Sequence, residues 1–98
     1  MNANREAVVP LPAPRRYIIQ RTFPVGALDG VTPEVKKMVN DNNKELGVTW
    51  EHSYANPDKT KTFCVYTGPN EAAIREAAKR NNLPIDVVTE IPVILYPK

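Results

Sequence analysis

Two short runs, TPEV and NEAA, carry the signals that start helices, and they limit which folds this chain can form. In the first, Thr32 stands at the N-cap, Pro33 at the first helical position and Glu34 in the first turn. Apolar residues then recur at helical spacing as far as Gly47, which is typical of a helix end. In the second, Asn70 caps the run NEAAIREAAKRNN. The sequence therefore predicts two helices, each with one apolar face.

Runs rich in β-branched and aromatic residues precede, separate and follow these helices, which is typical of strands. They are RYIIQRTF (16–23), VTWEHSYA (48–55) and KTFCVYTG (61–68). The run NPDK between the last two is a turn signal. A fourth strand is predicted within LPIDVVTEIPVILYP (83–97), interrupted at Pro92. Proline is tolerated on an edge strand but not inside a sheet, so this strand should lie at an edge.

The resulting order is strand, helix, strand, strand, helix, strand, which predicts an α+β fold of the ferredoxin-like kind. Two right-handed crossovers place the first and third strands in the centre of a four-stranded antiparallel sheet, with both helices on one face. We expect this domain to span residues 16–98. Residues 1–15 precede it, and Pro10, Pro12 and Pro14 predict a flexible, Pro-rich N-terminal arm rather than a secretion signal.

Composition excludes several classes of function. Within 98 residues the net charge is only +2 and acids and bases are interleaved, so no nucleic-acid partner is expected. No apolar run is long enough to span a membrane. The single cysteine, Cys64, excludes an internal disulfide and is compatible with a reducing cytoplasm, where we expect the protein to be located.

The predicted architecture leaves one face of the sheet without helices. A sheet face with apolar content is normally buried against another layer. We therefore expect a homodimer, formed either by two such faces meeting or by edge strands pairing.

The segment VTWEHSYANPDKTKTFCVY holds the only histidine, tryptophan and cysteine of the chain, and its pairing register decides which side chains share a face. Pairing Ala55 with Thr60 separates an apolar face from a polar one. Pairing Asn56 with Thr60 mixes the faces and forces Lys59 into the left-handed region, which is unfavourable without glycine. The first register is favoured, and it places His52 and Cys64 on opposite faces of the sheet.

In that register, His52 lies on the helix-covered face beside Trp50, Tyr54 and Phe63, and Glu51 points to the other face. Two interpretations follow: a packed aromatic cluster, or a small pocket with His52 as its polar group. As a site, it would be lined by Trp50, His52, Tyr54, Phe63 and Gln20, with His52 as base or metal ligand. Gln20 and Arg21, on the first strand, either reach such a pocket or end the strand against solvent. Cys64 is interpreted as a small buried side chain.

Three blocks, YIIQRTFP, ELGVTWEHSYANPDKTKTFCVY and NEAAIREAAKRNNLPIDVVTEIPVI, resemble a family of small bacterial nickel-binding proteins. The resemblance runs from about Tyr17 to Ile94 and is most specific in VTWEHSY, KTFCVY and the turn NLPID. It implies a ferredoxin-like dimer that binds nickel or another divalent metal near its surface, for sequestration. Only His52 corresponds to the nitrogen ligand that such a site needs, so carboxylates, waters or a second copy would have to complete it.

Two classes of function therefore remain from the sequence. The first is a non-enzymatic, dimeric nickel-binding protein with His52 as ligand. The second is a cofactor-free enzyme of the dimeric α+β barrel kind, in which His52 shuttles a proton on a small apolar or aromatic metabolite. A module that recruits another protein through its arm or sheet edge is a third, less specific interpretation.

Overall fold

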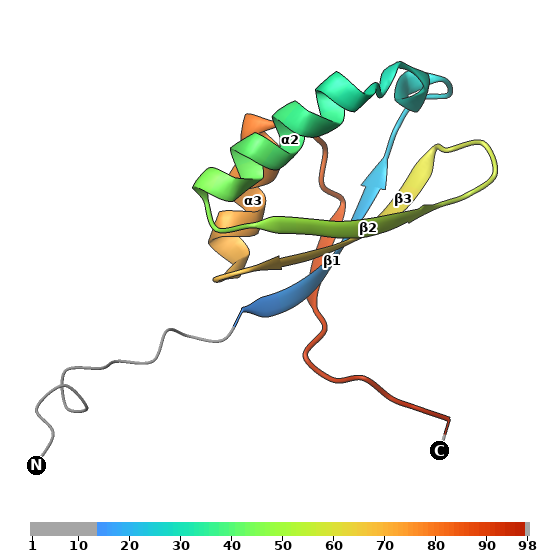
Figure 1. Cartoon of the computed structure of the whole chain (residues 1–98). Coiled ribbons are helices and arrows are strands. Elements are labelled where there is room, and N and C mark those ends of the chain that lie inside the picture. The colour runs from blue at the N-terminus through green and yellow to red at the C-terminus, as the bar shows by residue number, and fades with distance from the viewer. Residues whose placement is uncertain (1–13, 98) are drawn as a thin grey trace, which may run out of the picture.

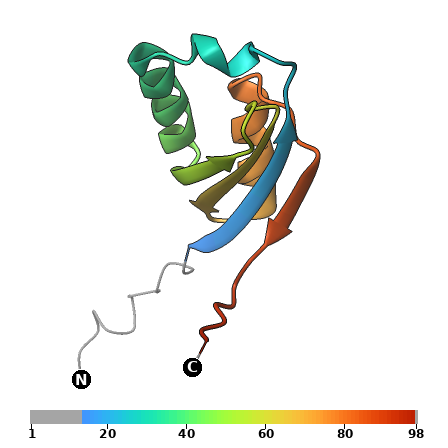
Figure 2. The same ribbon diagram turned by 90° about the vertical axis from the view of Figure 1, so that its right-hand side faces the viewer.

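The structure is a computed structural model that describes residues 14–97. Four antiparallel strands form one sheet in the order β2-β3-β1-β4, and both α-helices cover one of its faces (Figure 1; Figure 2). This confirms the predicted architecture, with the first and third strands central and the last at an edge. The elements are β1 (Arg15–Thr22), a 3-10 turn (Ala27–Gly30), α2 (Pro33–Glu45), β2 (Thr49–Ala55), β3 (Lys61–Gly68), α3 (Glu71–Arg80) and β4 (Val87–Glu90).

Both helices begin at the predicted caps. The Thr32 hydroxyl accepts a hydrogen bond from the Val35 amide at 3.2 Å, and the Asn70 side chain accepts one from the Ala73 amide at 2.8 Å. Each bond satisfies an amide that has no partner within its helix. Among the described residues, neither helix is long and apolar enough to cross a membrane.

The core lies between the sheet and the helices. Tyr17 and Ile19 from β1 meet Tyr66 from β3 and Ile74 and Ala77 from α3, and all five are buried. The helix approaches β3 closely at Gly68, where an added Cβ would lie 3.1 Å from Ile74 Cδ1. A side chain at this position would have to displace the side chain of Ile74.

The terminal parts of the chain differ in detail from the predictions. β1 begins at Arg15, one residue earlier than expected, and the rest of the predicted arm, residues 1–13, lies outside the described residues. β4 lies at the edge, as expected, but ends at Glu90, well short of residue 97. Its pairing with β1 stops just before Pro92, after the Ile91 amide donates to the Arg16 carbonyl at 2.9 Å.

Neither proposed hairpin register holds next to the turn, and the second holds only at the far end of the hairpin, where Thr49 pairs with Thr67 and Trp50 with Tyr66. Ala55 pairs with Thr62, because the loop between β2 and β3 is longer than either register assumed. The Asn56 side chain accepts a hydrogen bond from the Lys61 amide at 2.9 Å, and that of Asp58 accepts one from the Thr60 amide at 3.1 Å. These bonds stabilise the longer loop, in which Lys59 adopts the left-handed φ of 58° that was judged unfavourable.

A β-bulge then changes the register within β2. Trp50 pairs with Tyr66, whereas His52 pairs with Val65, so Glu51 is one residue in excess. Because β3 buries Cys64 and Tyr66 beneath the helices, its alternate residues Phe63 and Val65 face away from them. We call the helix-free side of the sheet the open face and the other side the covered face.

The bulge separates the aromatic cluster that the sequence predicted. Trp50 lies on the covered face, but His52, Tyr54 and Phe63 lie on the open face, so their predicted position beneath the helices is wrong. Cys64 and Tyr66 lie on the covered face, opposite to the side that the favoured register gave them. That His52 and Cys64 occupy opposite faces is confirmed, as is the burial of Cys64, which is 6% exposed.

The hairpin loop gives a direct stability test at Lys59. Lys59→Gly should raise the free energy of unfolding by about 0.5–1 kcal/mol, because glycine adopts positive φ without steric cost. Lys61→Gly, in the extended strand β3, is the matched control and should lower it by about 0.5–1 kcal/mol. Urea unfolding measures both, and equal losses in the two variants would contradict the loop conformation.

Candidate functional site

His52 lies on the open face of β2, an edge strand of the sheet. Its side chain is exposed, and its ring meets that of Tyr54 edge to face, with the centroids 5.2 Å apart. The imidazole is therefore held by an aromatic neighbour yet remains open to solvent. An exposed imidazole of this kind is a possible nitrogen ligand for a metal ion, and the role of His52 as ligand stays a prediction.

The bulge brings a carboxylate to the same face. Glu51 Oε2 accepts a hydrogen bond from the Thr67 hydroxyl at 2.8 Å, and Thr67 belongs to the open-face residues of β3. Glu51 and His52 therefore lie on one side of the sheet although they are adjacent in a strand. This corrects the sequence-based expectation that Glu51 points to the other face, which assumed uninterrupted alternation.

The described residues of one chain bring only two candidate metal ligands together here. Within residues 14–97 there is no group of three or more His, Cys, Asp and Glu side chains that could hold a metal ion. Glu51 and His52 offer one oxygen and one nitrogen, and imidazole is a preferred ligand type for nickel and zinc. A second pair from elsewhere would give four protein ligands.

Most of the predicted ligand-binding residues do lie together, but on the open face. Tyr54 pairs with Phe63, and Phe63 pairs with Gln20, so these three form a row across β2, β3 and β1. His52 lies in the neighbouring row beside Val65. Trp50 is the exception, because the bulge turns it to the covered face. Their roles in binding stay predictions.

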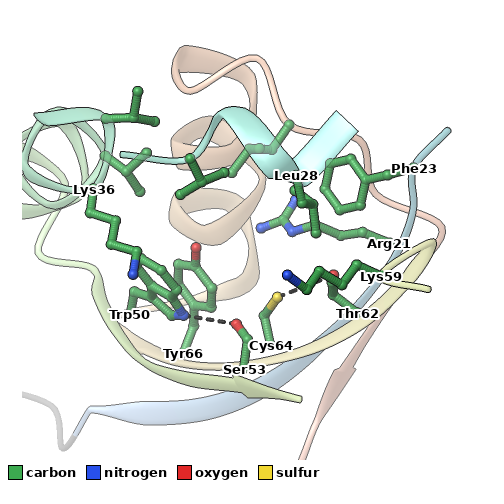
Figure 3. A pocket seen from close by; sticks show the side chains of 14 residues that line it. Arg21, Phe23, Leu28, Lys36, Trp50, Ser53, Lys59, Thr62, Cys64 and Tyr66 are labelled. Atoms are coloured by element: carbon green, nitrogen blue, oxygen red, sulfur yellow. Dashed lines mark hydrogen bonds between the residues drawn. The ribbon is translucent and has the colours of Figure 1, made fainter. Parts of the chain in front are cut away.

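A cavity of about 330 Å³ occupies the covered face, between the sheet, α2 and the hairpin loop (Figure 3). Trp50 lines it and donates a hydrogen bond from Nε1 to the Ser53 hydroxyl at 2.9 Å. Arg21 also lines it, which agrees with the prediction that this residue either reaches a pocket or ends its strand against solvent. Gln20 and His52 do not line the cavity. The proton-shuttle interpretation required His52 in a pocket beneath the helices, and the structure does not place it there.

The electrostatics of this cavity depend on Arg21 and Tyr66. The Tyr66 side chain is buried, and burial raises the pKa of its phenol; the nearby positive charge of Arg21 partly opposes that shift. Lys36 and Lys59 are further cationic lining residues. The sequence offered one signal for this site: Arg21 is charged, although it stands at a position of β1 where strand alternation predicts a buried side chain.

Comparison with known proteins connects the chain to one family. The family model described as nickel responsive protein SCO4226-like matches residues 17–91. The crystal structure of SCO4226 from Streptomyces coelicolor A3(2) superimposes with a TM-score of 0.59 and 18% sequence identity, over 82% of this chain and 99% of that one. At that identity the superposition shows a shared fold. A search of curated proteins found no match.

The buried phenol predicts how stability responds to alkali. The pKa of Tyr66 is higher in the folded than in the unfolded protein. The protonated phenol therefore contributes fully to the free energy of unfolding below about pH 10, the ordinary pKa of tyrosine, and this contribution is lost as the pH rises through the pKa of the folded protein. Wild type should therefore lose more unfolding free energy than Tyr66→Phe as the pH is raised above about 10. Urea unfolding at each pH measures the free energy of unfolding of both proteins, and the difference between wild type and Tyr66→Phe at neutral pH is the reference. A constant difference across the range would contradict the burial of the phenol.

Proposed function

We propose that this chain, which belongs to the nickel responsive SCO4226-like family, is a nickel-binding protein that completes its metal site by forming a homodimer. The observation that carries the proposal is the bulge in β2, which places Glu51 and His52 on one exposed face. The family description, nickel responsive, supports the choice of metal, and Glu51 and His52 are the ligands that we propose. Sequestration of nickel in the cytoplasm is the role that we propose for it.

The chemistry of the pair supports a divalent transition metal. His52 offers an imidazole nitrogen, and nitrogen ligands of this kind suit nickel, copper and zinc more than magnesium or calcium. Glu51 adds a negative charge, and the Thr67 hydroxyl at 2.8 Å holds its carboxylate in place. Hydrogen bonds of this kind orient metal ligands and strengthen metal sites.

The open face itself supports the dimer. Ile18, Phe63 and Val65 are only half-buried there, and Tyr54 and Val87 are 63% and 45% exposed. Apolar side chains gathered on one face are typical of an interaction surface. In a two-fold symmetric dimer each residue of the patch meets the equivalent patch of the other copy. A two-fold axis close to His52 would bring two imidazoles and two carboxylates around one ion.

The metal site is tested by nickel titration in a calorimeter. His52→Ala and Glu51→Gln should each weaken binding by about tenfold or more, because each removes a direct ligand. Glu45→Gln, an exposed carboxylate at the end of α2, is the matched control and should bind as wild type does. Wild-type affinity in His52→Ala would contradict the proposed site.

The interface is tested separately by molar mass in solution. Val65→Glu places a charge in the middle of the open face and should convert a dimer to a monomer, with nickel affinity falling at the same time. Ala72→Glu, on the exposed side of α3, should leave the mass unchanged. Light scattering at micromolar protein measures both, and a monomeric wild type in the presence of nickel would contradict the dimeric site.

A further inference from the structure

We propose that the cavity on the covered face binds a small organic acid, whose carboxylate pairs with Arg21 and whose apolar body fills the space beneath α2. This site lies on the opposite side of the sheet from Glu51 and His52 and does not rest on the proposed nickel function. Nickel-free protein is therefore suitable for testing it.

The first argument is the state of the Arg21 guanidinium. Arg21 is only 3% exposed, yet among residues 14–97 no carboxylate lies within 4.0 Å of it. Within that range its guanidinium donates a hydrogen bond from Nη1 to the Pro84 carbonyl at 2.6 Å and lies close to the Tyr66 phenol, which leaves most of its five N–H groups without a protein partner there. A buried charge without a counter-ion is costly, and an anionic ligand would remove that cost.

The second argument is that the guanidinium is held in place for binding. It lies over the Tyr66 ring, 5.8 Å from the ring centroid, while the Pro84 carbonyl fixes one end of it. Figure 3 shows the Arg21 side chain reaching into the cavity from β1, with the Tyr66 hydroxyl pointing into the same space. A fixed guanidinium matches the two oxygens of a carboxylate in a planar, bidentate pair.

The third argument is the lining. Among residues 14–97, every charged residue that lines the cavity is cationic: exposed Lys36 and Lys59 join Arg21, and no acidic residue of that range does. Figure 3 shows these lysines entering from different elements, Lys36 from α2 and Lys59 from the hairpin loop. Most other lining side chains are apolar: Phe23, Leu28, Val31, Val35, Val39 and Leu83.

Together these features select one class of ligand. Inorganic phosphate would satisfy Arg21 but leave the apolar wall unfilled, and a neutral apolar molecule would leave Arg21 unpaired. A cation would be repelled by all three basic side chains. The volume of about 330 Å³ is at the lower end of the range of ligand pockets, about 300–1,000 Å³, which favours a small acid with an aromatic or short aliphatic body.

The test uses Trp50, the single tryptophan of the chain, as its fluorescent reporter, since it lines the cavity. Nickel-free protein with a chelator is titrated with phenylacetate and octanoate, and with phenylacetamide, phenethylamine and inorganic phosphate. At least one of the two acids should give a saturable change in Trp50 fluorescence and bind about tenfold or more tightly than the neutral amide, the amine or phosphate. Binding of the amide as tight as that of phenylacetate, or no saturable binding of either acid, would overturn the proposal.

Variants then assign the charge that is recognised. Arg21→Gln should weaken acid binding by about tenfold or more, Arg21→Lys should recover part of it, and Arg75→Gln, an exposed arginine of α3, should match wild type. If Arg21→Gln does not fold, as its thermal unfolding would show, the double variant Lys36→Gln/Lys59→Gln should weaken binding by at least about threefold. Wild-type affinity in a folded Arg21→Gln protein would overturn the assignment. If Arg21→Gln does not fold, wild-type affinity in the double variant would overturn it instead.

The position of the bound acid is measured by amide chemical shifts in the same titration. Ser53 and Leu83, which line the cavity, should shift more than Val65 and Thr67 on the open face. Larger shifts on the open face would show that the acid binds the apolar patch there and would overturn the proposal.

Discussion

The extra residue at Glu51 decides which side of the sheet each side chain of β2 occupies. With uninterrupted alternation, Trp50 and His52 would share a face and Glu51 would point away from both. The bulge instead leaves Trp50 against the core beside Tyr66, and turns His52 to the open face together with Glu51. The proposed ligand pair on one face and Trp50 on the other both follow from this one irregularity.

The sheet then separates two kinds of chemistry on its two faces. The open face carries an imidazole, a carboxylate and a half-buried apolar surface, on which the proposal of a metal ion shared between two copies rests. The covered face carries a cavity whose charged lining residues, within the part of the chain that the structure describes, are all basic, with the buried guanidinium of Arg21 at its wall. Adjacent residues of β1, Gln20 and Arg21, point to different faces, so this strand contributes side chains to both faces of the sheet. The two proposals can therefore fail or succeed independently.

The fold could be predicted because its signals are local. The caps at Thr32 and Asn70 and the run of strands and helices each depend on a few neighbouring residues, and the structure contains all of them. The hairpin register could not be predicted, because it depends on the side-chain bonds of Asn56 and Asp58 within a longer loop and on a bulge that no glycine marks. The exposed His52 was identified from its residue type alone, whereas its partner Glu51 required the register.

The most direct test of this account is where a bound nickel ion lies relative to the sheet. Nickel is paramagnetic in octahedral sites, so it broadens the NMR signals of methyl groups near it. We expect the methyl signals of Val65 and Ile18, which follow His52 in the same row across the open face, to broaden on addition of nickel. Those of Ile19 and Ile74, buried beneath the helices, should change much less. Equal broadening on both sides, or stronger broadening of Ile19 and Ile74, would contradict the placement of the metal site.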